Sequence, residues 1–266
     1  MTIIIAAAES ASPRIGYQNL FESASSVSAS SEASGYEGSN SYNWDTASYW
    51  KPSSTGTFYL TATMAAATDA DYFAIYAHNL HTYSASVKLQ YSTNGSSWSD
   101  ATSSQAPSTG RPIFVSFDTI SAGWWRIELV TNSGPAQIGF ASFGEALIFP
   151  WGMRVGFSPA TLSRYSDVMN STSEGGQLLG RSLLRSGAKN TIECKLVTPA
   201  WARESWLPFI QHAEIKPFVF SWNWTNYPNE AAFCFTDGQI PPVTYSTYTG
   251  DGGRMDVRLP VNALIE

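Results

Sequence analysis

An alternating segment that runs into an Asn-Gly turn, at residues 85–98, constrains the fold of this chain most. Large apolar side chains in its first half alternate with polar ones, in the order Val87, Lys88, Leu89, Gln90 and Tyr91. A period of two is typical of a strand with one buried face. Asn94 and Gly95 readily adopt the positive φ that a tight hairpin requires. The segment therefore predicts half-buried antiparallel sheet.

A second alternating segment, residues 124–130, predicts another strand of the same kind. Its apolar face is formed by Trp125, Ile127 and Leu129, and its polar face by Arg126 and Glu128. It is therefore also expected to be a sheet strand with one buried and one solvated face.

Three motifs in this region resemble the discoidin-like (coagulation factor 5/8 type C) domain. They are an early Asp-to-Trp segment at residues 45–50, a Lys-Leu-x-Tyr-Ser-x-Asn-Gly-x-x-Trp hairpin at residues 88–98, and an aromatic-Arg-Ile-Glu-Leu strand at residues 125–129. The resemblance covers about residues 20–149, and the family's strand after the early tryptophan is loosely kept at residues 57–62. It implies an antiparallel β-sandwich that meets ligands with loops at one end.

Length and charge divide the chain into two parts. At 266 residues it exceeds one average domain. Residues 1–149 hold 5 Lys and Arg against 11 Asp and Glu, whereas residues 150–266 hold 10 of each. Pro150 and Gly152, which are typical of turns and linkers, lie where the charge balance changes. We therefore predict a discoidin-like domain at residues 1–149 and a second β domain at residues 150–266, with an opening strand at residues 1–10 that the two could share.

Composition argues against several classes of partner. Neither half has a basic stripe, so no nucleic acid is expected. No apolar run is long enough to cross a membrane, and the short apolar start lacks the basic residues of a signal peptide. We therefore expect synthesis in the cytoplasm without a signal peptide and no membrane insertion. Cys194 and Cys234 are too few for a disulfide scaffold and are expected to be small buried hydrophobes.

The second half is predicted to be mostly β with one short helix. Residues 164–177 are polar and glycine-broken, which indicates a loop or short hairpin. Residues 191–196 alternate like a half-buried strand. Thr198 is the expected N-cap of the helix and Pro199 its first residue, and Pro208 is expected to stop or kink the helix after Leu207.

Aromatic side chains dominate the strand that follows this helix. Alternation places four of them on one face: Phe218, Phe220, Trp222 and Trp224. Four large aromatic side chains on one face indicate either a domain core or an interface between subunits. Residues 231–236 and 255–261 predict two further strands, so the fold class is an antiparallel β-sandwich followed by a second mostly-β domain.

The second half resembles the distal-tail-type tip proteins of long-tailed bacteriophages. The resemblance lies in residues 174–182, 217–222, 227–238 and 255–257. It implies a structural virion component that forms a ring with copies of itself and other tail proteins at the end of the tail tube. The aromatic face would then be an assembly interface, and the sandwich would project outward toward a host-surface glycan.

Residues that could support catalysis or metal binding are sparse. His78 and His81 have a His-x-x-His spacing, but a turn with both rings satisfied locally is favoured because no third ligand is near. Glu37 and Asp45 could form a carboxylate pair for glycoside hydrolysis, although their Ser, Asn and Gly neighbours favour loop caps. We expect no enzymatic activity, no cofactor and no metal. A calcium ion near Asp45 would have only one carboxylate ligand, which is a weak signal for a calcium site.

The better binding candidate is an aromatic loop, because flat rings stack on sugar faces while Asn and Asp bind hydroxyls. The predicted ligand-binding residues are Tyr42, Trp44, Asp45 and Trp50. For Trp50 a core position is the competing interpretation, and for Trp44 the two are balanced. A carbohydrate-binding module with a β accessory domain is the alternative to the tail-tip hypothesis, and a polysaccharide hydrolase is a third.

Overall fold

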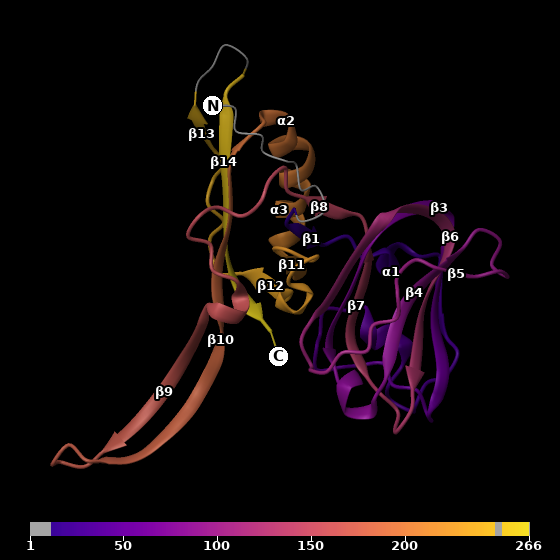
Figure 1. The fold of residues 1–266 in the computed structure, drawn as a ribbon, viewed down its shortest axis with the longest axis horizontal. Helices are drawn as coiled ribbons and strands as arrows, with labels where there is room; N and C mark the ends of the chain where they lie inside the picture. Colours follow the sequence, from indigo (N-terminus) through magenta and orange to yellow (C-terminus); the bar gives the residue numbers. More distant parts are fainter. Residues whose placement is uncertain (1–11, 248–251, 266) are drawn as a thin grey trace.

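The computed structural model describes residues 12–247 and 252–265, so the predicted opening strand at residues 1–10 lies outside it. The described chain is mostly β, as predicted, and forms one six-stranded and one eight-stranded sheet. Figure 1 shows a closed sandwich beside an extended second sheet, from which a long hairpin projects.

The sandwich is built from one strongly bent sheet. Its strands are β2 (Ser26–Ala29), β3 (Gly56–His78), β4 (Ser86–Ser92), β5 (Ser99–Asp100), β6 (Ile113–Thr131) and β7 (Ile138–Gly144). The order is β2-β3-β6-β4-β5, and β7 pairs with the second half of β3. Register shifts interrupt the β3–β6 pairing between Thr63 and Thr68. Each long strand therefore serves both layers, and the buried core between them includes Leu60 from the first half of β3 and Phe73 from the second.

Both alternating segments form the strands that the sequence predicts. Leu89 of β4 lies opposite Ile127 of β6, and both are fully buried. The turn is wider than predicted, because β5 starts only at Ser99 and of the Asn-Gly pair only Gly95 has a positive φ, 73°. Asn94 instead closes the loop with its side-chain Oδ1, which accepts hydrogen bonds from the backbone N–H groups of residues 96 and 97.

The second sheet has the strand order β8-β1-β11-β12-β14-β10-β9, and β13 pairs with β14. These strands are β1 (Arg14–Gly16), β8 (Ala146–Ile148), β9 (Arg164–Thr172), β10 (Leu178–Val197), β11 (Phe218–Ser221), β12 (Ala232–Thr236), β13 (Thr244–Thr247) and β14 (Arg254–Leu264). From its first described strand, β1, the chain thus leaves this sheet to build the sandwich and returns at β8. The predicted division at residues 149 and 150 stays a prediction.

Short helical turns connect these strands. They are α1 (Leu20–Ser23) and the 3-10 turns η2 (Gly38–Ser41), η3 (Leu80–Tyr83), η4 (Ala160–Leu162) and η6 (Pro228–Glu230). The one longer helix of the described chain runs through α2 (Pro199–Trp201), a π-helical stretch, η5 (Ala202–Trp206), and α3 (Leu207–Ala213).

The start of this helix is as predicted, and its end is not. Thr198 Oγ1 accepts a hydrogen bond from the backbone N–H of Trp201 at 3.2 Å. Pro208 does not stop the helix, which continues through α3 to Ala213. The N–H of Leu207 bonds to the carbonyl of Ala202, a π-type step that places Pro208 in the first turn of α3, where its missing N–H costs little.

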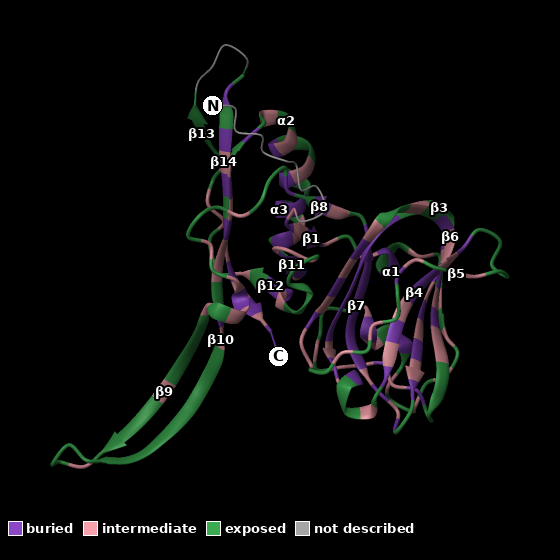
Figure 2. Ribbon diagram, viewed as in Figure 1, coloured by how far each residue is buried: buried purple, intermediate pink, exposed green. Residues whose placement is uncertain are grey.

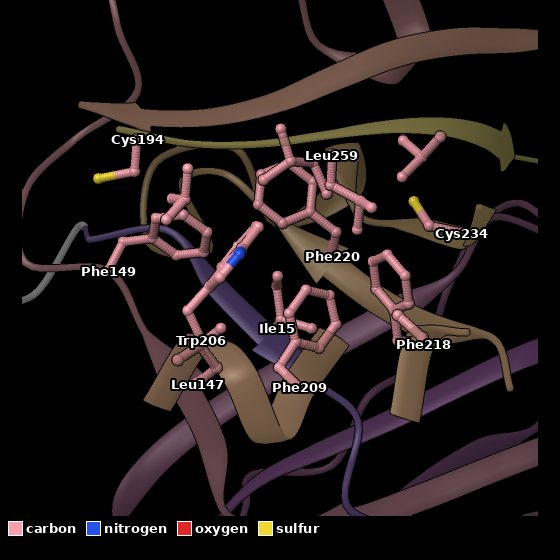
Figure 3. Packing of buried hydrophobic residues seen from close by; sticks show 14 of the residues in the cluster. Ile15, Leu147, Phe149, Cys194, Trp206, Phe209, Phe218, Phe220, Cys234 and Leu259 are labelled. Carbon is pink, nitrogen blue, oxygen red and sulfur yellow. The ribbon is translucent and has the colours of Figure 1, made fainter. Parts of the chain in front are cut away.

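The helix covers one face of the second sheet and buries the aromatic side chains on that face of the sheet (Figure 3). Phe209 packs edge-to-face on Phe218, with ring centroids 4.9 Å apart. Phe218 and Phe220 are only 0% and 4% exposed, so the prediction that they form an interface between subunits is wrong for these two. Trp222 and Trp224 are half-buried, with Trp222 at the edge of this core and Trp224 on the opposite side of the sheet.

Both cysteines are free and lie in this core, as predicted. Burial raises the pKa of Cys194 to about 12, and it raises the pKa of Cys234 as well. Both thiols are therefore protonated at neutral pH and act as small apolar groups.

Residues 164–187 form a long hairpin, which we call the arm, rather than the loop or short hairpin predicted. The arm consists of β9, the turn at residues 173–177 and the first half of β10. It leaves the body of the protein, and almost all of its residues are exposed (Figures 1 and 2). Further along β10, Leu196 has φ 59° at a bulge and points outward, so the predicted alternation ends at Cys194.

The sandwich and the second sheet meet along an apolar contact that we call the seam. Its core is the stack of Tyr76 from β3 on Phe233 from β12, with ring centroids 4.7 Å apart. At one end, Arg14 of β1 donates to Ser116 and lies 3.8 Å from Asp71. The seam thus joins the two units with both apolar and ionic contacts.

Candidate functional site

The loop between η2 and β3 holds the predicted binding residues. Asn43 Oδ1 accepts a hydrogen bond from the Asp45 N–H, and Asp45 Oδ1 accepts one from the Ala47 N–H, both at 2.9 Å. The first of these turns contains Trp44 and the second follows it directly, so both fix the backbone at this residue. Asp45 therefore acts as a loop cap, which was the interpretation that the sequence favoured.

The aromatic residues of this loop have different roles. Trp44 is 57% exposed, whereas Trp50 is 0% exposed and donates its indole N–H to the Ser31 carbonyl at 3.0 Å. The prediction that Trp50 contacts a ligand is therefore wrong, because its ring fills the sandwich core. Tyr42 is half-buried and stacks on Phe21. Trp44 is thus the one ring of the predicted set that offers a largely free face.

Trp44 lies at the edge of an open groove between the sandwich loop and the second sheet. The groove has a volume of about 350 Å³, and Trp44 and Thr46 form its sandwich side. The other side comes from the end of the long helix, the turn that follows it, and the ends of β12 and β14. Ile215 and Phe235 are exposed there and complete an apolar lining. No sequence pattern indicated this half of the groove, because tertiary folding brings it to Trp44.

The charged groups of the groove are few. Lys216 pairs with Glu22 of the sandwich. Glu214 lines the groove and has no ion-pair or side-chain hydrogen-bond partner among the described residues. The groove therefore combines an exposed indole with one uncompensated carboxylate.

Of the predicted histidine pair, only His81, in the turn η3, is satisfied locally; His78 ends β3, bonds to a residue distant in sequence, and has a buried Nδ1 without a hydrogen-bond partner in the described part of the chain. His78 is buried, its Nε2 lies 2.9 Å from the Arg111 carbonyl oxygen, and His81 Nε2 lies 3.4 Å from the Thr82 hydroxyl. Burial lowers the pKa of His78 to about 4. No cluster of three or more His, Cys, Asp or Glu side chains suited to a metal occurs in residues 12–247 and 252–265.

The outer face of the sandwich carries a stack that the sequence did not reveal. The Arg126 guanidinium lies over the Tyr59 ring at 4.0 Å and over the Trp98 ring at 4.1 Å, and Arg126 Nε donates to Gln90 Oε1 at 2.7 Å. Since both rings already face the guanidinium, the stack stabilises the sheet surface rather than offering a free platform.

Residues 26–142 match the family model of the F5/8 type C domain. This range contains all six strands of the sandwich apart from the last two residues of β7. The first unit of the chain is therefore a discoidin-like β-sandwich, as its three motifs predicted.

Several solved structures are similar to this part of the chain. A pectin-binding carbohydrate-binding module is 14% identical, with a TM-score of 0.39, over 45% of this chain and 89% of its own. A chitosan-binding module from Paenibacillus sp. IK-5 is 14% identical, with a TM-score of 0.40, over 48% and 98%. A CBM32 module from Clostridium perfringens, solved with GalNAc-β-1,3-galactose, is 11% identical, with a TM-score of 0.39, over 45% and 94%. No curated protein matches the chain.

Within the described residues, the helices are too short or too polar to cross a membrane.

Proposed function

We propose that the discoidin-like domain binds a glycan, with Trp44 as the platform on which a sugar ring stacks. The observation that supports this most directly is the exposed indole, which two side-chain-capped turns hold at the edge of a groove. Burying the apolar face of a sugar against an aromatic ring gains hydrophobic and dispersion energy, and polar neighbours bind the hydroxyl groups.

The proposed role is binding without catalysis. Glycoside hydrolysis needs two carboxyl groups on either side of the bond that is cleaved. The groove lining contains one carboxylate, that of Glu214, and Asp45 and Glu37 both serve the loop backbone and side chains nearby. This donor set suits recognition of a sugar.

The test is binding of the whole chain to an array of bacterial and plant glycans, followed by calorimetry on the ligands found. Trp44→Ala should reduce affinity at least about fivefold, since stacking on an aromatic ring contributes about 1–3 kcal/mol. Trp151→Ala is the matched control, because Trp151 is also exposed but lies outside the groove. Unchanged binding by Trp44→Ala would contradict the proposal.

A second role, assembly into a ring with copies of itself, is favoured by the arm. Its exposed leucines are 56–68% accessible and lie on both of its faces: Leu178, Leu179, Leu183 and Leu184. Large apolar side chains on a projecting ribbon are typical of an interaction surface. We propose that the arm contacts a neighbouring subunit, and that the resemblance to phage tail-tip proteins reflects a place in the virion at the end of a tail tube.

Light scattering of the purified chain over a range of concentrations tests the assembly role. The wild-type chain should form oligomers, and the double variant Leu183→Ser with Leu184→Ser should shift the mass toward the monomer without changing its circular dichroism. A monomer at all concentrations, together with no labelled copies on phage particles by electron microscopy, would count against this role.

A further inference from the structure

The groove beside Trp44 carries an excess of negative charge. Its lining contains two charged side chains, and that of Lys216 is neutralised by Glu22. Glu214 remains, with no side-chain partner in the described chain. The sandwich on the other side of the groove belongs to the half of the sequence that holds the entire net charge of −6.

The end of the long helix adds to this potential. Ala213 is the last residue of α3, and both Ala213 and Glu214 line the groove. Carbonyl groups at a helix C-terminus carry a partial negative charge that favours nearby cations. The turn is held by backbone hydrogen bonds from Glu214 to Ile210 and from Ile215 and Lys216 to His212. Glu214 is thus attached to a fixed backbone at the negative end of a helix.

Resting on the proposed glycan function, we infer that this groove selects sugars that carry a free, positively charged amino group. With one sugar face stacked on Trp44, an ammonium group of the same ring or its neighbour bonds the Glu214 carboxylate. A charge-assisted hydrogen bond is about twice as strong as a neutral one. A neutral hydroxyl or acetamide group at this position contributes less binding free energy, and the carboxylate of an acidic sugar is repelled by Glu214.

The site is therefore composite. Trp44 comes from the sandwich, and the group that distinguishes one sugar from another comes from the second unit. The discoidin-like domain alone would retain stacking and lose the preference.

Calorimetry of the full chain with chitotriose and with its fully N-acetylated counterpart tests this inference. The two probes differ only in whether the amines are free. We expect chitotriose to bind at least fivefold more tightly, with the difference shrinking as salt is raised. Glu214→Gln should lower affinity for chitotriose about fivefold and leave the acetylated probe unchanged. Glu204→Gln, an exposed carboxylate of the same helix outside the groove, is the control and should change neither.

The outcomes separate this inference from the glycan function itself. Equal binding of both probes, reduced by Trp44→Ala, would overturn the selectivity and leave the glycan function standing. A preference for chitotriose that persists in Glu214→Gln would overturn the role of Glu214. Binding of neither probe, with other glycans bound through Trp44, also overturns the selectivity alone. Binding of no glycan at all would overturn both.

Discussion

At the scale of single residues, neighbouring tryptophans of one loop have opposite roles. Trp44 and Trp50 are only six positions apart in the sequence. Trp50 pairs with Ile138 through two backbone hydrogen bonds, which draw its ring into the core, whereas the capped turns push Trp44 outward. Local sequence does not distinguish them, because the difference comes from a contact with a distant strand.

Substituting the two tryptophans should affect the free energy of unfolding to different extents. Trp50→Ala should lower the free energy of unfolding by about 3–5 kcal/mol, because it opens a cavity and leaves the Ser31 carbonyl without its partner. Trp44→Ala should change it by less than about 0.5 kcal/mol. Urea denaturation followed by circular dichroism measures both, and similar losses in the two variants would contradict the assigned burial.

His78 should make stability depend on pH. Its pKa is lowered to about 4 in the folded protein, whereas the unfolded chain takes up the proton near pH 6.5. Because the unfolded state then binds more protons, stability falls as the pH drops from about 6.5 to about 4, by up to about 3 kcal/mol.

Denaturant titrations at pH 7 and pH 4.5 check this pH dependence. His78→Gln keeps a donor for the Arg111 carbonyl and should reduce the loss between the two pH values. His81→Gln, at an exposed position, should not. The same pH dependence in wild type and His78→Gln would refute the assignment.

At the scale of elements, the arm contrasts with the long strands of the two cores. Those strands have a buried face, as in β14, where Val257, Leu259 and Val261 are at most 1% exposed. The arm has none, and its sequence lacks the alternation that marks a strand with one buried face. Sequence patterning therefore missed its length, because periodicity reports burial and the arm is exposed on both faces.

Hydrogen exchange should show the arm as the least protected sheet of the isolated chain. A two-stranded ribbon without a hydrophobic face is marginally stable in water. Amides of residues 165–171 and 179–186 should exchange far faster than those of β14, and assembly should slow them. Protection equal to that of β14 in a monomeric sample would contradict this expectation.

At the scale of the whole molecule, the seam makes the groove a fixed feature. Phe233 stacks on Tyr76 and packs edge-to-face on Phe140, with centroids 5.0 Å apart in the second contact. These contacts join β12, whose end lines the groove, to the strands of the sandwich. The position of Trp44 opposite Glu214 therefore depends on the seam.

Phe233→Ala should weaken both the fold and the groove. We expect a loss of about 3 kcal/mol in unfolding free energy, and denaturation in two steps where the wild type shows one, as the units separate. Phe235→Leu, at a partly exposed position two residues on, is the matched control and should keep one transition. Calorimetric scans measure the difference, and a single unshifted transition in Phe233→Ala would argue against the seam.

The sequence by itself determined the class of the fold and much of its local detail. The alternation of Val87 with Leu89 and of Ile127 with Leu129 defined buried strand faces, and Thr198 with Pro199 defined where the helix starts. These features depend on side-chain period and on capping, which involve near neighbours only.

Tertiary structure alone decided the site and the surfaces. It buried Phe218 and Phe220 beneath the helix, and a π turn allowed the helix to continue past Pro208. It also left the arm exposed and placed Glu214 and Trp44 in the lining of one groove. Each of these outcomes depends on contacts between segments far apart in the chain. Such contacts form where packing of the whole molecule is most favourable, and no local pattern encodes them.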